Sequence, residues 1–167
     1  MPTITLPDNT QREYKESLTI MQVAQDIGPG LAKATIAGYI DDELHDACEI
    51  IECDAHLRII TNKDPEGIEI IRHSFAHLMG HAVKQLFPDA KMAIGPVIED
   101  GFYYDIDIEK PLTPDNVQAI EIRMNELIKK DYDVVREVVS REKALQIFIK
   151  RDEPYKQEII KEISDNE

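Results

Sequence analysis

The chain has 167 residues, of which 43% are apolar, 31% are charged and only 6% are aromatic. Its 33 acidic side chains outnumber its 19 basic ones, and the resulting formal net charge of −14 repels phosphate backbones at long range. The composition therefore argues against tight binding of nucleic acid by this chain alone. No stretch approaches the roughly 18 consecutive apolar residues of a membrane span, so we expect no membrane association.

The cysteine content points to a reducing compartment. Cys48 and Cys53 have no second metal-type pair elsewhere in the sequence, which favours two reduced thiols over a zinc half-site or a disulfide. The N-terminus has neither the basic region nor the long apolar segment of a signal peptide. We therefore expect a soluble, cytoplasmic protein.

Residues 1–62 carry the pattern of a small ββαββ unit. Apolar side chains at positions 20, 23, 24 and 27 have the spacing of one helix face. Thr19 is its expected N-cap, and Gly28-Pro29-Gly30 is expected to end it. The expected elements are a hairpin over residues 3–17, a helix over 20–27 and strands over 34–40 and 56–60.

The pattern of residues 63–167 predicts a second unit. Residues 62–67 form the linker that leads into it. Asp64 followed by Pro65 has the pattern of an N-cap and a first helical residue. The expected elements are a helix over 66–87, an extended stretch over 91–98, a strand over 102–108, a helix over 113–130, a strand over 134–139 and helices over 140–150 and 154–163. These strands would leave sheet edges without partners, and the chain closes on the polar run 164–167. This pattern, and above all the family resemblance of the motifs described below, leads us to expect that the unit is the first part of a larger domain.

Three histidines stand four residues apart in the long predicted helix, at positions 73, 77 and 81. An i, i+4, i+8 series stacks along one side of a helix. Imidazole is the side chain whose ordinary pKa lies nearest neutrality, so such a stack can bind a metal, move a proton or position a water. Solvent-facing or structural histidines are the third interpretation, and the spacing alone does not choose among them.

The neighbouring residues weaken the metal interpretation. Zinc takes three or four ligands, yet the chain has no Cys after Cys53 and no His after His81. The residues that follow His73 are Ser-Phe-Ala, which lack the glutamate base of a metalloprotease helix. We therefore expect no metal at these histidines.

Two long adjacent motifs carry a family resemblance. The segment Arg72-His-Ser-Phe-Ala-His-Leu-Met-Gly-His-Ala-Val-Lys-Gln-Leu-Phe-Pro88, followed by Lys91-Met-Ala-Ile-Gly-Pro-Val-Ile-Glu-Asp-Gly-Phe-Tyr-Tyr-Asp105, closely resembles the start of the editing domain of bacterial threonyl-tRNA synthetases. The segment Ile27-Gly-Pro-Gly-Leu-Ala-Lys-Ala34 resembles the TGS domain of the same family. The resemblance implies an α+β architecture, with a ubiquitin-like β-grasp TGS domain at 1–62 and an incomplete α/β editing domain at 63–167.

The resemblance also implies roles for individual residues. His73, His77 and Lys156, the last in the pair Tyr155-Lys156, match the family's catalytic editing residues. Gly95 and Tyr104 match the part of its motif that lines the substrate pocket. A later Cys-x-x-x-His segment of the family has no counterpart here, and nothing in the resemblance assigns a role to His81.

The implied parent enzyme joins threonine to tRNA(Thr) with ATP and hydrolyses mischarged seryl-tRNA(Thr) at the editing site. The ATP, its Mg²⁺, the threonine-selecting zinc and a homodimeric state are implied for the parent, and no cofactor is expected in this chain. We expect little or no activity from the chain alone. Two alternatives remain open, namely a TGS-type binding or regulatory module and a metal-dependent hydrolase that uses His73, His77 and His81.

Overall fold

The computed structural model describes residues 1–132 and 134–163, so the polar run 164–167 lies outside the described residues. The chain divides into two compact units, Met1–Ile71 and Arg72–Glu167. The sequence motifs put the boundary near residue 62. The helix α3 (Pro65–Leu86) accounts for the later division, because it begins in the first unit and continues into the second.

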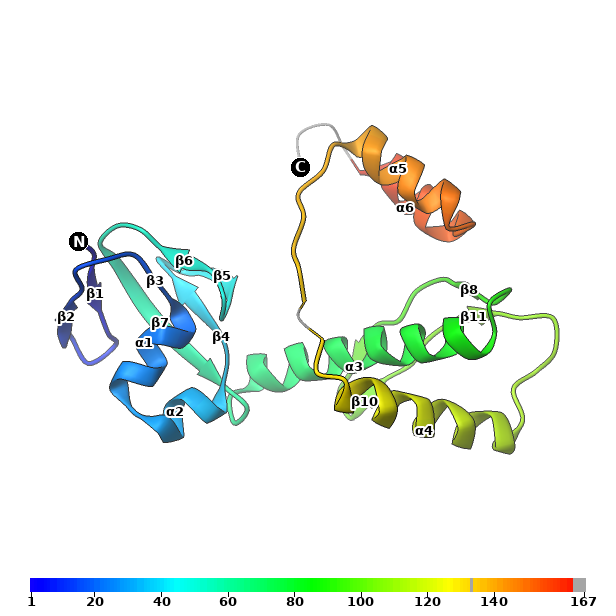
Figure 1. Cartoon of the computed structure of the whole chain (residues 1–167), viewed down its shortest axis with the longest axis horizontal. Helices are drawn as coiled ribbons and strands as arrows, with labels where there is room; N and C mark the ends of the chain where they lie inside the picture. The colour runs from blue at the N-terminus through cyan, green and yellow to red at the C-terminus, as the bar shows by residue number, and fades with distance from the viewer. Residues whose placement is uncertain (133, 164–167) are drawn as a thin grey trace. The chain divides into compact units, whose positions relative to one another are not determined.

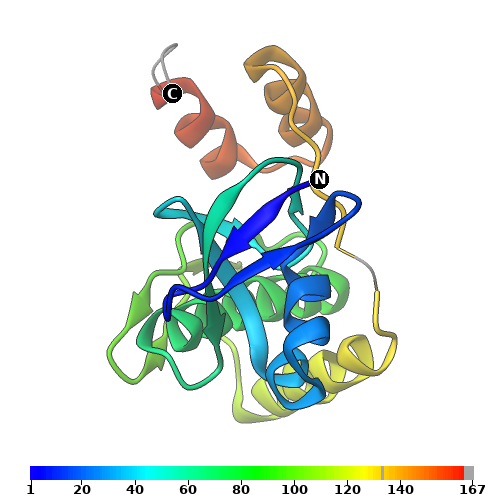
Figure 2. The same cartoon turned by 90° about the vertical axis from the view of Figure 1, so that its left-hand side faces the viewer.

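The first unit is built on a five-stranded sheet in the order β2-β1-β7-β4-β5 (Figures 1 and 2). Strands β1 and β7 run parallel, and the other neighbouring pairs are antiparallel. A separate two-stranded pair joins β3 to β6. The strands are β1 (Thr3–Thr5), β2 (Gln11–Glu13), β3 (Leu18–Thr19), β4 (Thr35–Ile40), β5 (Glu43–Asp46), β6 (Ile50–Ile51) and β7 (Ala55–Thr61). The predicted hairpin and the α+β class are confirmed.

The helix α1 (Ile20–Ile27) closes the core of this unit. Thr19 forms a capping box with Gln22, in which each side chain bonds the other residue's backbone N–H, so the start of the helix is fixed locally. The apolar face of α1 places Ile20 and Val23 in one buried cluster with Leu57 of β7. The helix packs on the sheet through this apolar face, which is the face that the helical spacing of the sequence predicts.

The glycine and proline residues after α1 have two effects. The helix ends at Ile27 as expected, and Gly28 donates its N–H to the Ala24 carbonyl at 3.0 Å. A second helix, α2 (Pro29–Ala34), then begins at Pro29 and was not predicted. Proline suits a first helical position because its φ is already fixed and no hydrogen bond is lost there.

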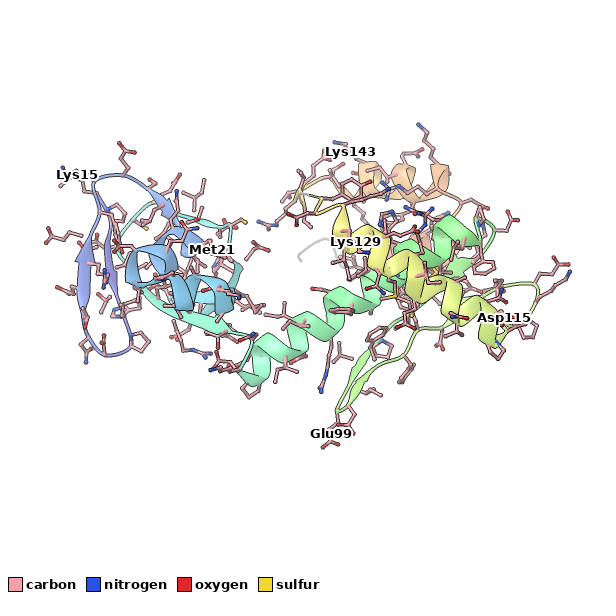
Figure 3. The ribbon with its side chains drawn as sticks, turned by 60° about the horizontal axis from the view of Figure 1, so that its bottom comes forward. Lys15, Met21, Glu99, Asp115, Lys129 and Lys143 are labelled. Atoms are coloured by element: carbon pink, nitrogen blue, oxygen red, sulfur yellow. The ribbon has the colours of Figure 1, made fainter. Side chains whose placement is uncertain are left out.

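The second unit combines helices with an irregular hairpin. The elements after α3 are β8 (Lys91–Met92), β9 (Val97–Ile98), β10 (Gly101–Phe102), β11 (Ile106–Asp107), α4 (Pro114–Lys129), α5 (Arg141–Lys150) and α6 (Pro154–Glu162). Strand β8 pairs with β11 and β9 with β10, and Figure 3 shows Glu99 at the tip of the hairpin. The predicted strand 102–108 is therefore two short pieces. Pro96, which has no N–H to donate, lies opposite the break between them.

The core of the second unit lies between α3, α4 and the hairpin. Its buried members are Ala82, Val83, Ala90, Met92, Ile120 and Leu127. Helix α4 begins at a second capping box, formed by Thr113 and Asn116, which confirms the predicted start. Helices α5 and α6 lie side by side, and the guanidinium of Arg141 donates to the Ile160 carbonyl at 3.1 Å.

The predicted strand 134–139 is wrong. These residues form no strand in the described part of the chain, and Val134, Val135 and Val138 are 98%, 85% and 82% exposed. The preference of valine for strands expresses packing on a pleated surface, and no described strand lies alongside to provide one.

Candidate functional site

The long helix α3 presents His73, His77 and Lys84 along one side. Successive residues of a helix are turned by about 100°, so positions 73, 77 and 84 fall within about 40° of one another. Ala76 and Val83 of the adjoining side are buried in the core, and this fixes the rotation of the helix. The two histidines and the lysine therefore share one edge of the packed face.

His73 and His77 contact each other directly. Their Nε2 atoms lie 2.8 Å apart, and the ring centroids are 4.6 Å apart in an edge-on arrangement. One nitrogen must donate and the other accept, so at least one ring carries an unprotonated nitrogen in this arrangement. The pair can therefore accept a proton at one ring and share it with the other.

The electrostatic surroundings favour the neutral form of His77. Its pKa is lowered below the ordinary value, first by burial of the ring against its neighbours and then by the charges of His73 and Lys156. Both histidines still have substantial exposed surface, so a solvent molecule or a ligand can reach them. A neutral, accessible imidazole is the form that a general base requires.

His81 does not join the pair. Its Nε2 lies 2.9 Å from the side-chain amide nitrogen of Gln85, one helical turn further on. Among residues 1–132 and 134–163, no three His, Cys, Asp or Glu side chains converge as ligands for a metal ion. The described residues thus give no support to a hydrolase that uses a metal at His73, His77 and His81.

Lys156 is far from the histidines in the sequence, near the C-terminal end of the chain. It lies in the first turn of α6, and its Nζ donates to the Ala93 carbonyl at 2.8 Å. Its charge contributes to the lowered pKa of His77, so the ammonium lies within electrostatic reach of that ring. The preceding residue, Tyr155, donates its hydroxyl to Asp107 at 3.0 Å. The structure therefore brings His73, His77 and Lys156 into one region.

Gly95 and Tyr104 pack against each other on the two arms of the hairpin. A Cβ atom at position 95 would overlap the Tyr104 ring, with the ring Cγ only 3.0 Å away. The ring also lies near Gly80 of α3, and its hydroxyl has a raised pKa because of burial and the charge of Glu153. The glycine is required here because the aromatic ring occupies the space of a side chain.

The sequence reasoning missed an ion pair near these residues, between a buried carboxylate and a partly buried ammonium. Glu153 is only 7% exposed, and its carboxylate lies 2.8 Å from the ammonium of Lys84. The only signal in the sequence is that Lys84 stands seven residues after His77, on the same helix face. Its partner is 69 positions away and carries no motif.

Two of the hollows in the described residues include side chains that the sequence singles out. One lies between α3 and the end of α4 and is lined by Ser74, His77, Leu78, His81, Leu127, Ile128, Asp131, Tyr132 and Val134. It includes His77, whereas His73, Lys156, Gly95 and Tyr104 are not among its lining residues. His77 therefore faces both this hollow and its histidine partner.

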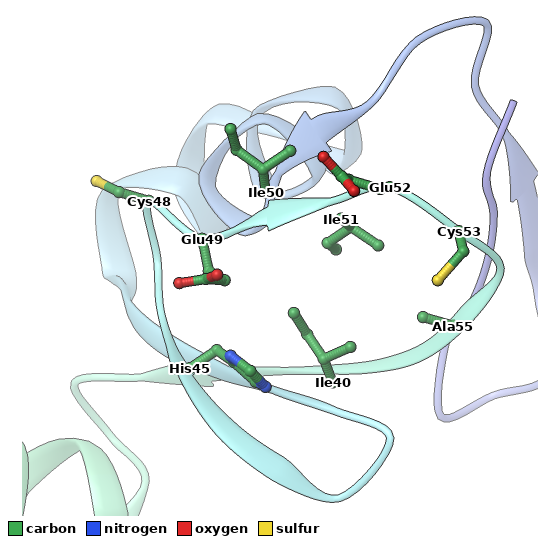
Figure 4. A pocket seen from close by; sticks show the side chains of 9 residues that line it. All are labelled: Ile40, His45, Cys48, Glu49, Ile50, Ile51, Glu52, Cys53 and Ala55. Carbon is green, nitrogen blue, oxygen red and sulfur yellow. The ribbon is translucent and has the colours of Figure 1, made fainter. Parts of the chain in front are cut away.

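The other hollow belongs to the first unit (Figure 4) and is lined by Ile40, His45, Cys48, Glu49, Ile50, Ile51, Glu52, Cys53 and Ala55. Figure 4 shows the two cysteines at opposite ends, with the Cys48 sulfur directed away from the hollow. Neither cysteine forms a disulfide. The two thiols therefore do not point to a common position in this hollow.

Comparison with known proteins first defines the class of the N-terminal unit. Residues 2–61 match the family model of the TGS domain. This stretch covers the five-stranded sheet with α1 and α2, so the first unit is a TGS domain of the β-grasp type.

The whole chain is also similar to the N-terminal region of curated threonine–tRNA ligases. It is 61% identical, over all of its 167 residues, to the threonine–tRNA ligase of Prochlorococcus marinus (strain MIT 9211). It is 59% identical over 166 residues to the threonine–tRNA ligase of Xanthomonas campestris pv. campestris (strain B100). The chain spans 26% of the length of each relative and corresponds to their N-terminal region, which confirms the resemblance that the motifs indicate. No helix in the described residues is long and apolar enough to cross a membrane.

Proposed function

We propose that this chain acts as the N-terminal part of a threonine–tRNA ligase and supplies half of a site that hydrolyses seryl-tRNA(Thr). The observation that carries the proposal is the His73–His77 pair, whose Nε2 atoms are 2.8 Å apart and whose His77 ring lies within electrostatic reach of Lys156. The identity of 61% to a ligase of this name supports the choice of substrate.

The need for such a site follows from the chemistry of the two amino acids. Serine differs from threonine by one methyl group, and a missing methylene is worth only about 1–3 kcal/mol of discrimination. An enzyme that cannot reject serine by binding alone can remove it afterwards by hydrolysis of the ester to tRNA.

The residues fit ester hydrolysis in the following way. A water bonds to the ester carbonyl carbon while an unprotonated imidazole nitrogen of the histidine pair takes its proton. Lys156 has three N–H donors, of which one bonds the Ala93 carbonyl, so the ammonium can also stabilise the developing oxyanion or hold the tRNA end. The bond from the carbonyl carbon to the ribose oxygen then breaks, the ribose oxygen regains a proton, and serine and tRNA leave.

The rest of the ligase supplies what this chain lacks. We propose that ATP, Mg²⁺ and the threonine-selecting zinc act in the part of the enzyme outside the match, in a cytoplasmic homodimer. The net charge of −14 makes tight tRNA binding by this chain alone unfavourable, so other domains must hold the tRNA.

The test uses a chimera in which this chain replaces the matching quarter of the Prochlorococcus ligase. We expect the chimera to hydrolyse seryl-tRNA(Thr), and His73→Ala or His77→Ala to slow hydrolysis by about 10²- to 10⁴-fold, the usual range for losing acid–base catalysis. His81→Ala is the matched control and should retain the rate. The 167-residue chain alone should hydrolyse the ester poorly. A chimera whose rate is unchanged by both histidine substitutions would refute the proposal.

A further inference from the structure

The ion pair between Lys84 and Glu153 joins a buried carboxylate to a partly buried ammonium, and all three N–H donors of the ammonium have an acceptor. The Lys84 ammonium donates to Glu153 at 2.8 Å, to the Pro88 carbonyl at 2.9 Å and to the Ala90 carbonyl at 2.7 Å. These three acceptors match the three N–H donors of an ammonium. Glu153 also accepts the backbone N–H of Met92 at 3.3 Å. The pair thus joins α3, β8 and the start of α6 at one point.

Glu153 lies at the start of α6, so the ion pair can influence the position of the first residues of this helix. Glu153 is the N-cap residue of α6, and Lys156 is the third residue of the helix. A helix rises about 1.5 Å per residue, so anchoring Glu153 sets the backbone position of Lys156 less than one turn away, and the bond from its ammonium to the Ala93 carbonyl then sets the direction of its side chain. Glu153 accepts a hydrogen bond from the backbone of Met92, and Lys156 donates one to the backbone of Ala93. The two side chains therefore bond successive residues at the end of β8.

Stability is a weak reason for such a pair. The cost of removing two charges from water largely offsets their attraction, and apolar residues of similar size often stabilise a fold as well or better. A buried pair does fix geometry, because its hydrogen bonds form in only one arrangement. Lys91 and Asp152 form a second ion pair in the same loop, but the Asp152 side chain is 83% exposed and so exerts little such constraint.

We propose that Lys84 and Glu153 are positioning residues for Lys156. They hold the first turn of α6 against β8, so that the Lys156 ammonium stays within electrostatic reach of the His73–His77 pair, which shares one side of α3 with Lys84. This inference deepens the proposed function and rests on it for its catalytic consequence, but the placement of Lys156 is testable without any activity.

The first experiment measures the pKa of His77 by NMR in the 167-residue chain. Lys156→Met should raise this pKa, because the ammonium contributes to lowering it. Glu153→Gln should raise it as well. Removing a carboxylate would by itself lower the pKa of a nearby imidazole, so a rise reports displacement of Lys156. Asp152→Asn, in the same loop, is the matched control and should leave the pKa unchanged.

The second experiment measures seryl-tRNA(Thr) hydrolysis in the chimera. Glu153→Gln should lower kcat on the order of 100-fold, the scale of a misplaced catalytic group. In a Lys156→Met background it should cause no further loss, because Glu153 then has nothing to position. If Glu153→Gln unfolds the second unit, Glu153→Asp replaces it, since Asp keeps the buried charge but shortens its reach by one methylene.

The outcomes separate the two proposals. An unshifted His77 pKa in Glu153→Gln, or an equal loss of kcat in both backgrounds, overturns the positioning role. An inactive wild-type chimera overturns the editing function, and in that case the NMR titration still decides whether Glu153 places Lys156.

Discussion

In the first unit five strands pair into one sheet, whereas the strands of the second unit meet only in pairs two residues long. Both units hold a helix that begins at a complete capping box, at Thr19 and at Thr113. Of the 18 large apolar side chains exposed in the described residues, 4 belong to the first unit and 14 to the second. Both units thus carry a clear local signal, and they differ in how much of their apolar surface tertiary packing covers.

The largest expected effect tests this difference in burial. Ile60 of β7 is fully buried, and Ile60→Ala should lower the free energy of unfolding of the first unit by about 2–5 kcal/mol, since it leaves a cavity. Val134→Ala, at a side chain that is 98% exposed, should change stability by less than about 0.5 kcal/mol. Denaturant unfolding followed by circular dichroism measures both. A comparable loss from Val134→Ala would mean that the valine is covered in solution.

An intermediate effect tests whether the local signals are equivalent. Thr19→Ala and Thr113→Ala each remove the hydroxyl that accepts a backbone N–H, so each should destabilise its own unit by about 1 kcal/mol. Thermal unfolding, with NMR signals of each unit as separate probes, gives the two values. Val134→Ala, at a side chain that is 98% exposed, is again the control. Losses that differ severalfold would show that tertiary packing changes the strength of a cap.

The smallest expected effect is a pH dependence confined to the second unit. The pKa of His77 is lowered in the folded chain, so the unfolded chain binds a proton more readily. The contribution of His77 to stability is then complete above the ordinary histidine pKa of about 6.5 and is lost as the pH falls below it. We expect the second unit to be less stable at about pH 5.5 than at about pH 7.5, and His77→Gln to weaken this dependence. A steeper fall in His77→Gln would contradict the assignment.

The helices other than α2 were predictable because their signals are local. Thr19, Thr113 and Ser140 cap the helices that the sequence assigns to them, and each cap depends on residues within one turn. The strand predicted over 134–139 failed because a strand depends on a neighbour elsewhere in the chain. The same reason explains why the predicted strand 102–108 appears as two short pieces.

The candidate site divides in a similar way. The contact between His73 and His77 follows from helical spacing alone, whereas Lys156 was found only through the family motif. Glu153 was missed because the residues around it give no indication that its partner is Lys84, 69 positions earlier in the sequence. The chemistry assigned to His73, His77, Lys156, Gly95 and Tyr104 stays a prediction until hydrolysis is measured.

The contact between Gly95 and Tyr104 has a consequence for how this sequence can change over evolution. Any side chain at position 95 must displace the ring, and any smaller residue at position 104 leaves the glycine facing an empty space. A single substitution at either position therefore leaves a mismatch that a substitution at the other can relieve. Among relatives, we expect the two positions to vary together or not at all.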